Sequence, residues 1–141
     1  MDIRTITPDY AVTPQIEPED IPEIKEAGFT TVICNRPDGE VPMELHGEVL
    51  KAAVEAAGLT FVDNPLVHAE LSMGHVERQA AAQKEATGPV LAYCASGTRS
   101  SILWSLSQAG HRTTEEILSA TGKAGYELSH LAPQLDALAK K

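Results

Sequence analysis

The chain of 141 residues is poor in cysteine and in basic side chains, and both shortages exclude classes of protein. Cys34 and Cys94 are its only cysteines, too few for the disulfide framework of a small secreted domain. It has 11 Lys and Arg against 20 Asp and Glu, a formal net charge of −9. Nucleic acids and anionic membrane surfaces are bound through a basic footprint, so neither is expected as a partner. Because the net negative charge of the chain repels anions, any anion-binding site must be formed by local groups.

Long apolar runs and metal-ligand patterns are missing as well. No apolar stretch reaches the length of a membrane span, and the first residues, MDIRTITPDY, lack the basic and then apolar pattern of a signal peptide. We therefore expect a cytoplasmic protein with reduced thiols. No histidine shares metal-ligand spacing with another histidine or with a cysteine, so neither a metal nor a cofactor is expected. The five are His46, His68, His75, His111 and His130.

What remains is the composition of an ordinary globular protein, 43% hydrophobic and 22% charged, and its length fits one domain over residues 1–141. Short β-rich runs alternate with amphipathic patterns. The runs YAVTPQI, FTTVIC, LTFVDNPL and PVLAYC predict strands. Helices are predicted near residues 21–27 and over 42–58, 73–87, 100–110 and 113–122, with shorter helices after 123 that break near Pro133. The alternation favours an α/β domain with a four- to five-stranded, mostly parallel sheet flanked by helices.

Three local features are specific enough to be checked. Along the helix over 42–58, one face is predicted to carry Leu45, Val49, Ala52, Ala53 and Ala56. Ser72 is expected to cap the next helix. Near the C-terminus, Thr113 and Glu116 have the spacing of a capping box.

In open α/β sheets, ligands bind beyond the carboxyl ends of the strands. Three segments follow predicted strands and should meet at that edge: CNRPDGE, NPLVHAEL and CASGTRS. The site is therefore expected to be assembled from residues that lie far apart in the sequence.

The segment CASGTRS has the composition of a thiolate facing an anion cradle. A helix N-terminus and Arg99 would both favour the thiolate form of Cys94. Gly97 allows the backbone to curl, so that its N–H groups converge on an oxyanion. Arg99 offers a bidentate fork, and Ser100 can donate to the departing sulfur. The cradle residues are Ala95, Ser96, Gly97 and Thr98. A lone strand-end cysteine is more often inert, but the strand–loop–helix context favours the functional interpretation.

The loop YCASGTRSS resembles the active-site loop of cysteine-dependent phosphatases and of rhodanese-type sulfurtransferases. With VICNRPDGE, AAVEAAGLTFVDNPLV and GPVLAYCASGTRSSILWSL, nearly the whole chain resembles the bacterial family of phosphatase-like domains of beta-lactamase hydrolase-like proteins. This resemblance implies a dual-specificity-phosphatase-like fold. It also implies that Cys94 is the nucleophile, Arg99 the oxyanion clamp and Ser100 the residue that assists the thiolate.

Two departures from the phosphatase pattern bear on the chemistry. Four residues separate Cys94 from Arg99, one fewer than in the usual phosphatase loop and the length common among rhodaneses. Where such phosphatases carry an aspartate as general acid, PLVHAEL offers His68, with Glu70 close by. A histidine can protonate a leaving group near neutral pH, but His68 is equally well read as a polar loop residue.

Three further residues each allow two interpretations. Asp38, beside Gly39, is more often a turn-former than a catalyst. Arg36 is either a second anion contact or a solvated charge. Cys34 is a buried core thiol or, if its strand neighbours that of Cys94, a resolving partner that forms a reversible disulfide.

The sequence thus predicts a phosphomonoester hydrolase that works through a phosphocysteine on Cys94. The alternative is a rhodanese-like sulfurtransferase that carries a sulfane sulfur on Cys94, since such chemistry needs no general acid and tolerates the short loop. A non-catalytic anion-binding or redox-sensing module is a third possibility. The expected partner is a phosphorylated or sulfur-containing substrate, either a small molecule or a protein.

Overall fold

A five-stranded sheet forms the centre of the computed structural model, which describes residues 1–140 apart from the side chain of His68. The spatial order is β1-β2-β5-β3-β4, and only the β1–β2 pair is antiparallel. The strands are β1 (Arg4–Thr7), β2 (Tyr10–Thr13), β3 (Thr31–Cys34), β4 (Thr60–Asp63) and β5 (Val90–Tyr93). The predicted mostly parallel α/β sheet is confirmed.

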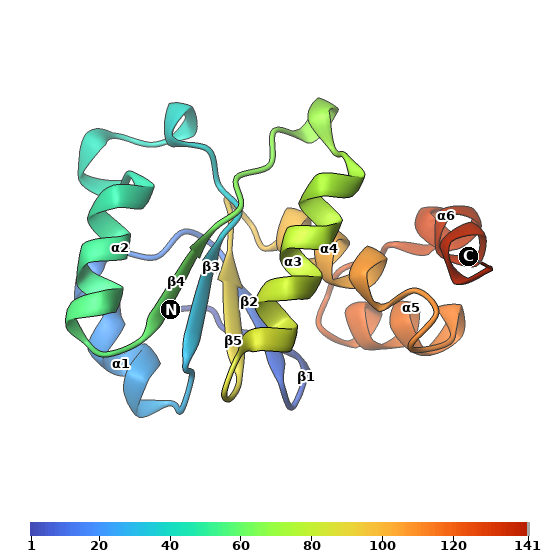
Figure 1. Ribbon diagram of the computed structural model, residues 1–141, viewed down its shortest axis with the longest axis horizontal. Coiled ribbons are helices and arrows are strands. Elements are labelled where there is room, and N and C mark those ends of the chain that lie inside the picture. The colour runs from blue at the N-terminus through green and yellow to red at the C-terminus, as the bar shows by residue number, and fades with distance from the viewer. Residues whose placement is uncertain (141) are drawn as a thin grey trace.

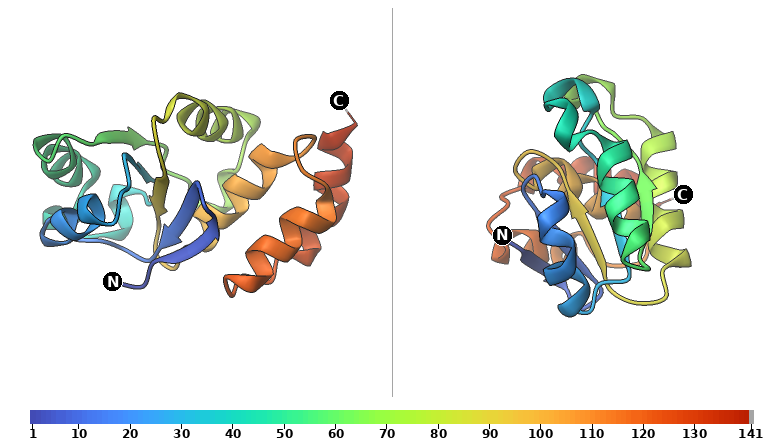
Figure 2. Two further views of the ribbon diagram at one scale, coloured as in Figure 1. Left: turned by 90° about the horizontal axis from the view of Figure 1, so that it is seen from below. Right: turned by 90° about the vertical axis from the view of Figure 1, so that its left-hand side faces the viewer.

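Six α-helices flank the sheet: α1 (Ile21–Glu26), α2 (Gly47–Ala56), α3 (Met73–Glu85), α4 (Thr98–Gln108), α5 (Thr114–Lys123) and α6 (Ala132–Ala139). In Figure 1, α1 and α2 lie on one side of the sheet and α3 and α4 on the other. Figure 2 shows α5 and α6 beyond α4, on the same side. None of the helices within residues 1–140 is long and apolar enough to cross a membrane.

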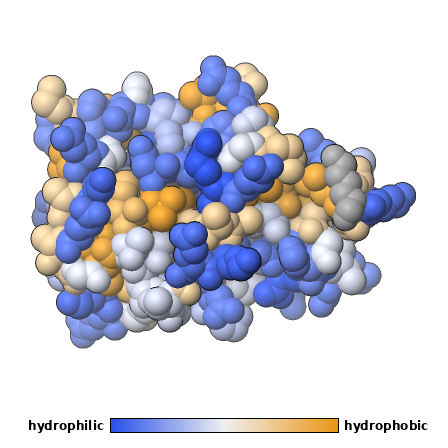
Figure 3. All heavy atoms as spheres, in the orientation of Figure 1, coloured by the Kyte–Doolittle hydropathy of each residue, from blue (hydrophilic) through white to orange (hydrophobic). Residues whose placement is uncertain are grey.

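Alternation along the strands divides the core into two layers. Val32 packs with Leu50 and Leu91 beneath α1 and α2. Its neighbour Ile33 faces the other way and packs with Leu103 beneath α3 and α4. Because successive side chains of a strand point to opposite faces, one apolar run fills both layers, as is typical of strands in a parallel sheet. On the face seen in Figure 3, apolar areas are interspersed among hydrophilic ones.

The register brings the carboxyl ends of the four parallel strands into one row. Thr13 and Cys34 are both paired with Tyr93, and Cys34 is also paired with Asp63. The residues that follow these strands, among them Asn35, therefore emerge at one edge of the sheet, where the sequence placed the site.

Two sequence predictions need correction. The buried face of α2 carries Leu50 and Val54, whereas Val49 is 37% exposed, because the helix begins at Gly47 and Leu45 belongs to a separate 3₁₀ turn (Met43–Leu45). Pro133 does not break a helix: it lies in the first turn of α6, where the missing N–H has no helical partner to lose.

Other local predictions are confirmed, and one strand was missed. Ser72 precedes α3 and forms a capping box with His75. Thr113 and Glu116 form the predicted capping box of α5, with N–H···O distances of 2.9 and 3.0 Å. Strand β1 was not predicted, because RTIT buries only Ile6 and has no apolar period to reveal it.

Candidate active site

The loop between β5 and α4 curls around the sulfur of Cys94. Gly97 has φ +93°, a left-handed conformation that favours glycine, and its N–H donates to Cys94 Sγ at 3.1 Å. Cys94 is fully buried, whereas Ala95 and Ser96 are exposed. The cysteine thus lies within the loop, and the loop itself forms part of the surface.

The remaining loop contacts fix its shape. The Ser96 and Thr98 hydroxyls are 2.9 Å apart, and the Thr98 N–H donates to Ser96 Oγ at 3.4 Å. Behind the loop, the Tyr126 hydroxyl donates to the Ser96 carbonyl at 2.9 Å. The loop is therefore a compact, internally bonded turn at the N-terminus of α4, and the convergence of its N–H groups on an oxyanion stays a prediction.

Arg99 is held by a carboxylate from a distant loop. Its Nη1 and Nη2 donate to Glu40 Oε2 and Oε1 at 2.8 and 2.7 Å, and Nη1 also donates to the Leu66 carbonyl at 2.8 Å. The Arg99 side chain is only 4% exposed. Hydrogen bonding to Glu40 raises the pKa of Arg99, and the nearby Cys94 sulfur acts in the same direction. In return, the Arg99 hydrogen bond lowers the pKa of Glu40, so both groups stay charged.

Ser100 makes different contacts from the one predicted. Its hydroxyl donates to Asn35 Oδ1 at 2.9 Å, and its carbonyl accepts from the Tyr10 hydroxyl at 2.8 Å. In this arrangement the hydroxyl proton is directed to Asn35 and not to the sulfur of Cys94. Ser100 anchors the first turn of α4.

A buried polar network lies beneath that turn. The Asn35 side-chain amide donates to the Asn64 carbonyl at 2.9 Å and to Gln79 Oε1 at 3.3 Å. Gln79 Nε2 in turn donates to the Tyr10 hydroxyl at 2.9 Å. Asn35, Asn64 and Gln79 are all 0% exposed. A buried network whose members are hydrogen-bonded is rigid, so the ends of β3 and β4 are fixed to α3 and α4.

The structure gives Arg36 and Asp38 supporting positions. Arg36 Nε donates to Glu40 Oε1 at 3.3 Å, and its Nη1 donates to the Gln15 side chain at 3.3 Å. Asp38 Oδ1 accepts from the Gly47 N–H at 2.8 Å, at the start of α2. Arg36 is thus a second cation beside Glu40, and Asp38 opens the 3₁₀ turn Asp38–Glu40 and accepts from the start of α2.

His68 opens the 3₁₀ turn His68–Glu70, which follows β4. This places its backbone at the edge of the sheet where Leu66 contacts Arg99. The side chain lies outside the described part of the structure, so its role as general acid stays a prediction.

Cys34 lies on the other face of the sheet from the loop between β5 and α4. Strands β3 and β5 are neighbours, as expected, but Cys34 is paired with Tyr93 and not with Cys94. Its thiol packs in the layer of α1 and α2 and donates to the Arg36 carbonyl at 3.3 Å. Burial raises its pKa to about 11. The assumption that the two cysteines end their strands side by side is wrong, and the placement supports a core thiol.

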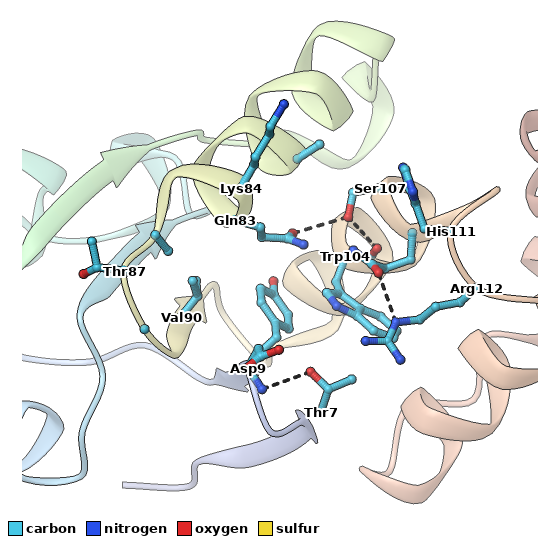
Figure 4. A pocket seen from close by; sticks show the side chains of 15 residues that line it. Thr7, Asp9, Gln83, Lys84, Thr87, Val90, Trp104, Ser107, His111 and Arg112 are labelled. Atoms are coloured by element: carbon cyan, nitrogen blue, oxygen red, sulfur yellow. Dashed lines mark hydrogen bonds between the residues drawn. The ribbon is translucent and has the colours of Figure 1, made fainter.

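Two cavities flank the sheet at opposite edges. One of about 690 Å³ is lined by Tyr10 and Val90 at the starts of β2 and β5, with Arg112 beside Trp104 (Figure 4). Its Lys84 lies in the last turn of α3, where a cation complements the helix carbonyls. The other, about 270 Å³, is lined by residues of the segments after β3 and β4, which also hold Glu40 and Leu66, and by one residue of α3: Arg36, Pro37, Asp38, Asp63, Pro65, Val67, Glu70 and His75. Of these two, the smaller cavity adjoins the segments of the Cys94 site.

Sequence reasoning missed several residues that hold the site. Glu40 ends the predicted NRPDGE turn, and nothing local marks it as the partner of Arg99. Tyr126 lies 30 residues beyond Ser96. Asn35 gave a usable signal, since a polar side chain directly after a buried strand must find partners at the sheet edge.

Comparison with known proteins agrees with this geometry. A beta-lactamase hydrolase-like protein of Xylella fastidiosa (strain 9a5c) is 26% identical over 138 residues, which make up 96% of this chain and 32% of that protein. A second, from strain Temecula1, is 27% identical over 130 residues, 91% of this chain and 30% of that protein. The chain thus spans about a third of the length of these curated relatives.

Solved structures show the same architecture. A candidate phosphatase from Neisseria meningitidis superposes with a TM-score of 0.83 at 32% identity, covering 98% of this chain and 99% of that one. Tk-PTP in its active form superposes with a TM-score of 0.76 at 16% identity, covering 99% of this chain and 97% of that one. At that identity the likeness shows the fold alone. The sequence profile of the family "Beta-lactamase hydrolase-like protein, phosphatase-like domain" matches residues 2–111. The chain belongs to that family and has a fold like that of the protein tyrosine phosphatases.

Proposed function

We propose that the chain is a cysteine-dependent phosphatase that hydrolyses phosphomonoesters through a phosphocysteine on Cys94. One observation carries the proposal: Cys94 Sγ lies within a single turn that also presents the Gly97 N–H and a fixed Arg99 guanidinium. Family membership supports the same reaction class.

The donors of Arg99 are divided in a way that suits a phosphate. A guanidinium has five N–H donors. Glu40 and Leu66 take both donors of Nη1 and one of Nη2. The N–H of Nε and the second N–H of Nη2 lie along the other edge of the fork, where Glu40 and Leu66 make no hydrogen bond and the nearby side chain is that of Cys94. Two parallel donors of this kind match two oxygens of a phosphate, so Glu40 fixes one edge while the other is available to substrate.

The reaction has two steps. The Cys94 thiolate attacks phosphorus, the S–P bond forms, and the P–O bond to the leaving group breaks as that oxygen takes a proton from a general acid. Water then attacks phosphorus and gives a proton to the group that acted as the acid in the first step, the S–P bond breaks, and the thiolate is regenerated with inorganic phosphate. N–H groups and a guanidinium aimed at the phosphoryl oxygens stabilise charge that develops there in both transition states.

His68 is our candidate for the general acid. It lies two residues beyond Leu66, whose carbonyl accepts from Arg99. Of the carboxylates, Glu40 is engaged in the ion pair with Arg99 and its lowered pKa keeps it ionised near neutral pH, so it is a poor proton donor.

A sulfurtransferase is the second candidate. The observation that favours it is the short loop: only Ala95 to Thr98 separate Cys94 from Arg99, and they are drawn together by the Ser96–Thr98 contact. In that reaction the Cys94 thiolate would take the outer sulfur of thiosulfate, whose S–S bond breaks to release sulfite, and the resulting persulfide would pass that sulfur to an acceptor thiol or to cyanide, with no general acid.

One experiment separates the two. Purified protein is assayed on an aryl phosphate and on thiosulfate with cyanide, with Cys94→Ser as the inactive variant and Cys34→Ser as the matched control. We expect phosphate release that Cys94→Ser abolishes and Cys34→Ser retains. Thiocyanate formation without phosphate release would overturn the phosphatase assignment.

A further inference from the structure

We infer that Tyr126 is a positioning residue of the active site, which holds the Gly97 N–H against the sulfur of Cys94. Tyr126 lies between α5 and α6, outside residues 2–111 that the family profile matches. The inference deepens the proposed function, and it rests on that function only in taking Cys94 as the nucleophile.

One peptide group connects the tyrosine to the sulfur. The Tyr126 hydroxyl donates to the carbonyl of Ser96 at 2.9 Å, and the N–H of Gly97 donates to Cys94 Sγ at 3.1 Å. That carbonyl and that N–H belong to the same trans peptide, so they point in opposite directions. Fixing the carbonyl from behind therefore fixes the N–H toward the sulfur, and hydrogen bonds in such a chain polarise one another.

Gly97 shows how closely the tyrosine covers the back of the loop. A Cβ atom added at Gly97 would overlap the Tyr126 hydroxyl and come within 3.3 Å of Val12. The position thus requires glycine for its φ of +93° and also because the phenol occupies the space where a side chain would go.

Tyr126 is itself held from two sides. Its N–H donates to the Thr121 carbonyl at 2.9 Å, and its ring lies 5.5 Å from the Arg4 guanidinium, a cation–π contact. Arg4 also donates to the Ala124 carbonyl at 3.2 Å. Strand β1 and the turn after α5 therefore place the phenol, which is only 7% exposed.

The charged and titratable groups around the sulfur are few in the described structure. Arg99 comes from α4, Tyr10 from β2 and Tyr126 from the segment after α5. Burial raises the pKa of Tyr126 from its usual value near 10. The phenol is therefore neutral at physiological pH and acts as a donor to Ser96.

The test is Tyr126→Phe, which removes the hydroxyl and keeps the ring against Arg4. The thiolate of Cys94 is titrated by its ultraviolet absorbance in a Cys34→Ser background, with a Cys94→Ser trace subtracted. We expect the thiolate population at pH values below the inflection to fall, by at most the roughly threefold to tenfold that corresponds to one whole hydrogen bond. The matched control is Ser105→Ala, which removes a buried hydroxyl that donates to Ser101 within α4 and does not touch the loop.

An unchanged titration of Cys94 in Tyr126→Phe would overturn the inference. An equal shift in Ser105→Ala would also overturn it, because the change would then come from a general loss of packing and not from the Tyr126 hydroxyl. Amide hydrogen exchange provides a second measurement: the Gly97 N–H should exchange faster in Tyr126→Phe only. The titration does not depend on turnover. If Tyr126→Phe shows the shift but the wild-type protein releases no phosphate, the proposed function is refuted and the role of Tyr126 is intact.

Discussion

Glu40 and Arg99 form a bidentate ion pair across 59 residues of sequence, with N–O distances of 2.7 and 2.8 Å. The pair is asymmetric: the Arg99 side chain is 4% exposed and that of Glu40 is 35% exposed. A buried cation that is oriented by a half-exposed carboxylate is fixed in direction but remains close to solvent. This is the arrangement that a clamp for an incoming anion needs.

The first prediction follows from that pair. Glu40→Gln keeps the shape of the side chain but removes the charge that aligns the guanidinium. We expect kcat on an aryl phosphate to fall about tenfold through lost positioning, while KM stays the same or decreases because a charge that repels the dianion is gone. Glu44→Gln, at an exposed position on the neighbouring 3₁₀ turn, is the matched control and should leave both kcat and KM unchanged. A rise in kcat would mean that Glu40 obstructs the site instead of ordering it.

The second prediction concerns stability in acid. The Arg99 hydrogen bond lowers the pKa of Glu40 below its ordinary 4.5. A carboxyl whose pKa is depressed on folding contributes stability above its unfolded pKa, and this stability is lost as the pH falls through the folded pKa. Urea midpoints measured at about pH 6 and about pH 3.5 should therefore differ more in wild type than in Glu40→Gln. Equal differences in the two proteins would mean that other carboxyls account for the acid sensitivity.

The third prediction tests the anion site itself. Phosphate or sulfate at about a hundred times its dissociation constant should stabilise the fold by roughly 2.7 kcal/mol. Arg99→Ala removes the only formal positive charge of the loop and should abolish most of that gain, whereas Arg36→Ala should retain most of it, because Arg36 points to Glu40 and Gln15. Thermal melts with and without sulfate measure this. An undiminished shift in Arg99→Ala would locate the anion elsewhere.

Much of the fold could be predicted from the sequence because its signals are local. Continuous apolar runs such as VIC and PVLAYC indicate buried parallel strands, and the capping box at Thr113 needs only four residues to recognise. The predicted face of α2 was wrong by one position because the pattern was counted from Leu45, whereas the helix begins at Gly47, whose N–H donates to the Asp38 side chain. That contact forms only in the folded chain.

The candidate site likewise has a part that local sequence predicts and a part that it does not. Cys94, Gly97 and Arg99 are close in sequence, so their chemistry could be read directly. Glu40, Gln79 and Tyr126 lie 30 to 59 residues from the site residues that they contact. Partners at such separations are chosen by sheet order and helix packing, which no local pattern encodes.

The fourth prediction concerns oxidation. Burial raises the pKa of the Cys34 thiol to about 11, so it is protonated and a weak nucleophile at neutral pH. Its side chain also lies in the layer of α1 and α2, paired with Tyr93. After mild peroxide treatment, peptide mapping should find Cys34 as a free thiol and oxidation confined to Cys94. Recovery of a Cys34–Cys94 disulfide would show that the sheet edge rearranges enough to bring the two thiols together.

The last prediction addresses the leaving group. If His68 is the general acid, it matters only when the departing oxygen needs a proton in the transition state. His68→Ala should slow hydrolysis of a phosphate ester with a poor leaving group by about 10²–10⁴-fold and barely affect a p-nitrophenyl ester, whose phenolate leaves without help.

His75→Ala is not a suitable control for His68→Ala, because His75 bonds to Ser72 and the Pro65 carbonyl at the start of α3. His130→Ala, at an exposed position, is a better one. Equal losses on both esters would remove His68 from proton transfer and leave it as a loop residue. Thiocyanate formation should be indifferent to the substitution, because sulfur transfer to cyanide releases no oxygen that needs a proton.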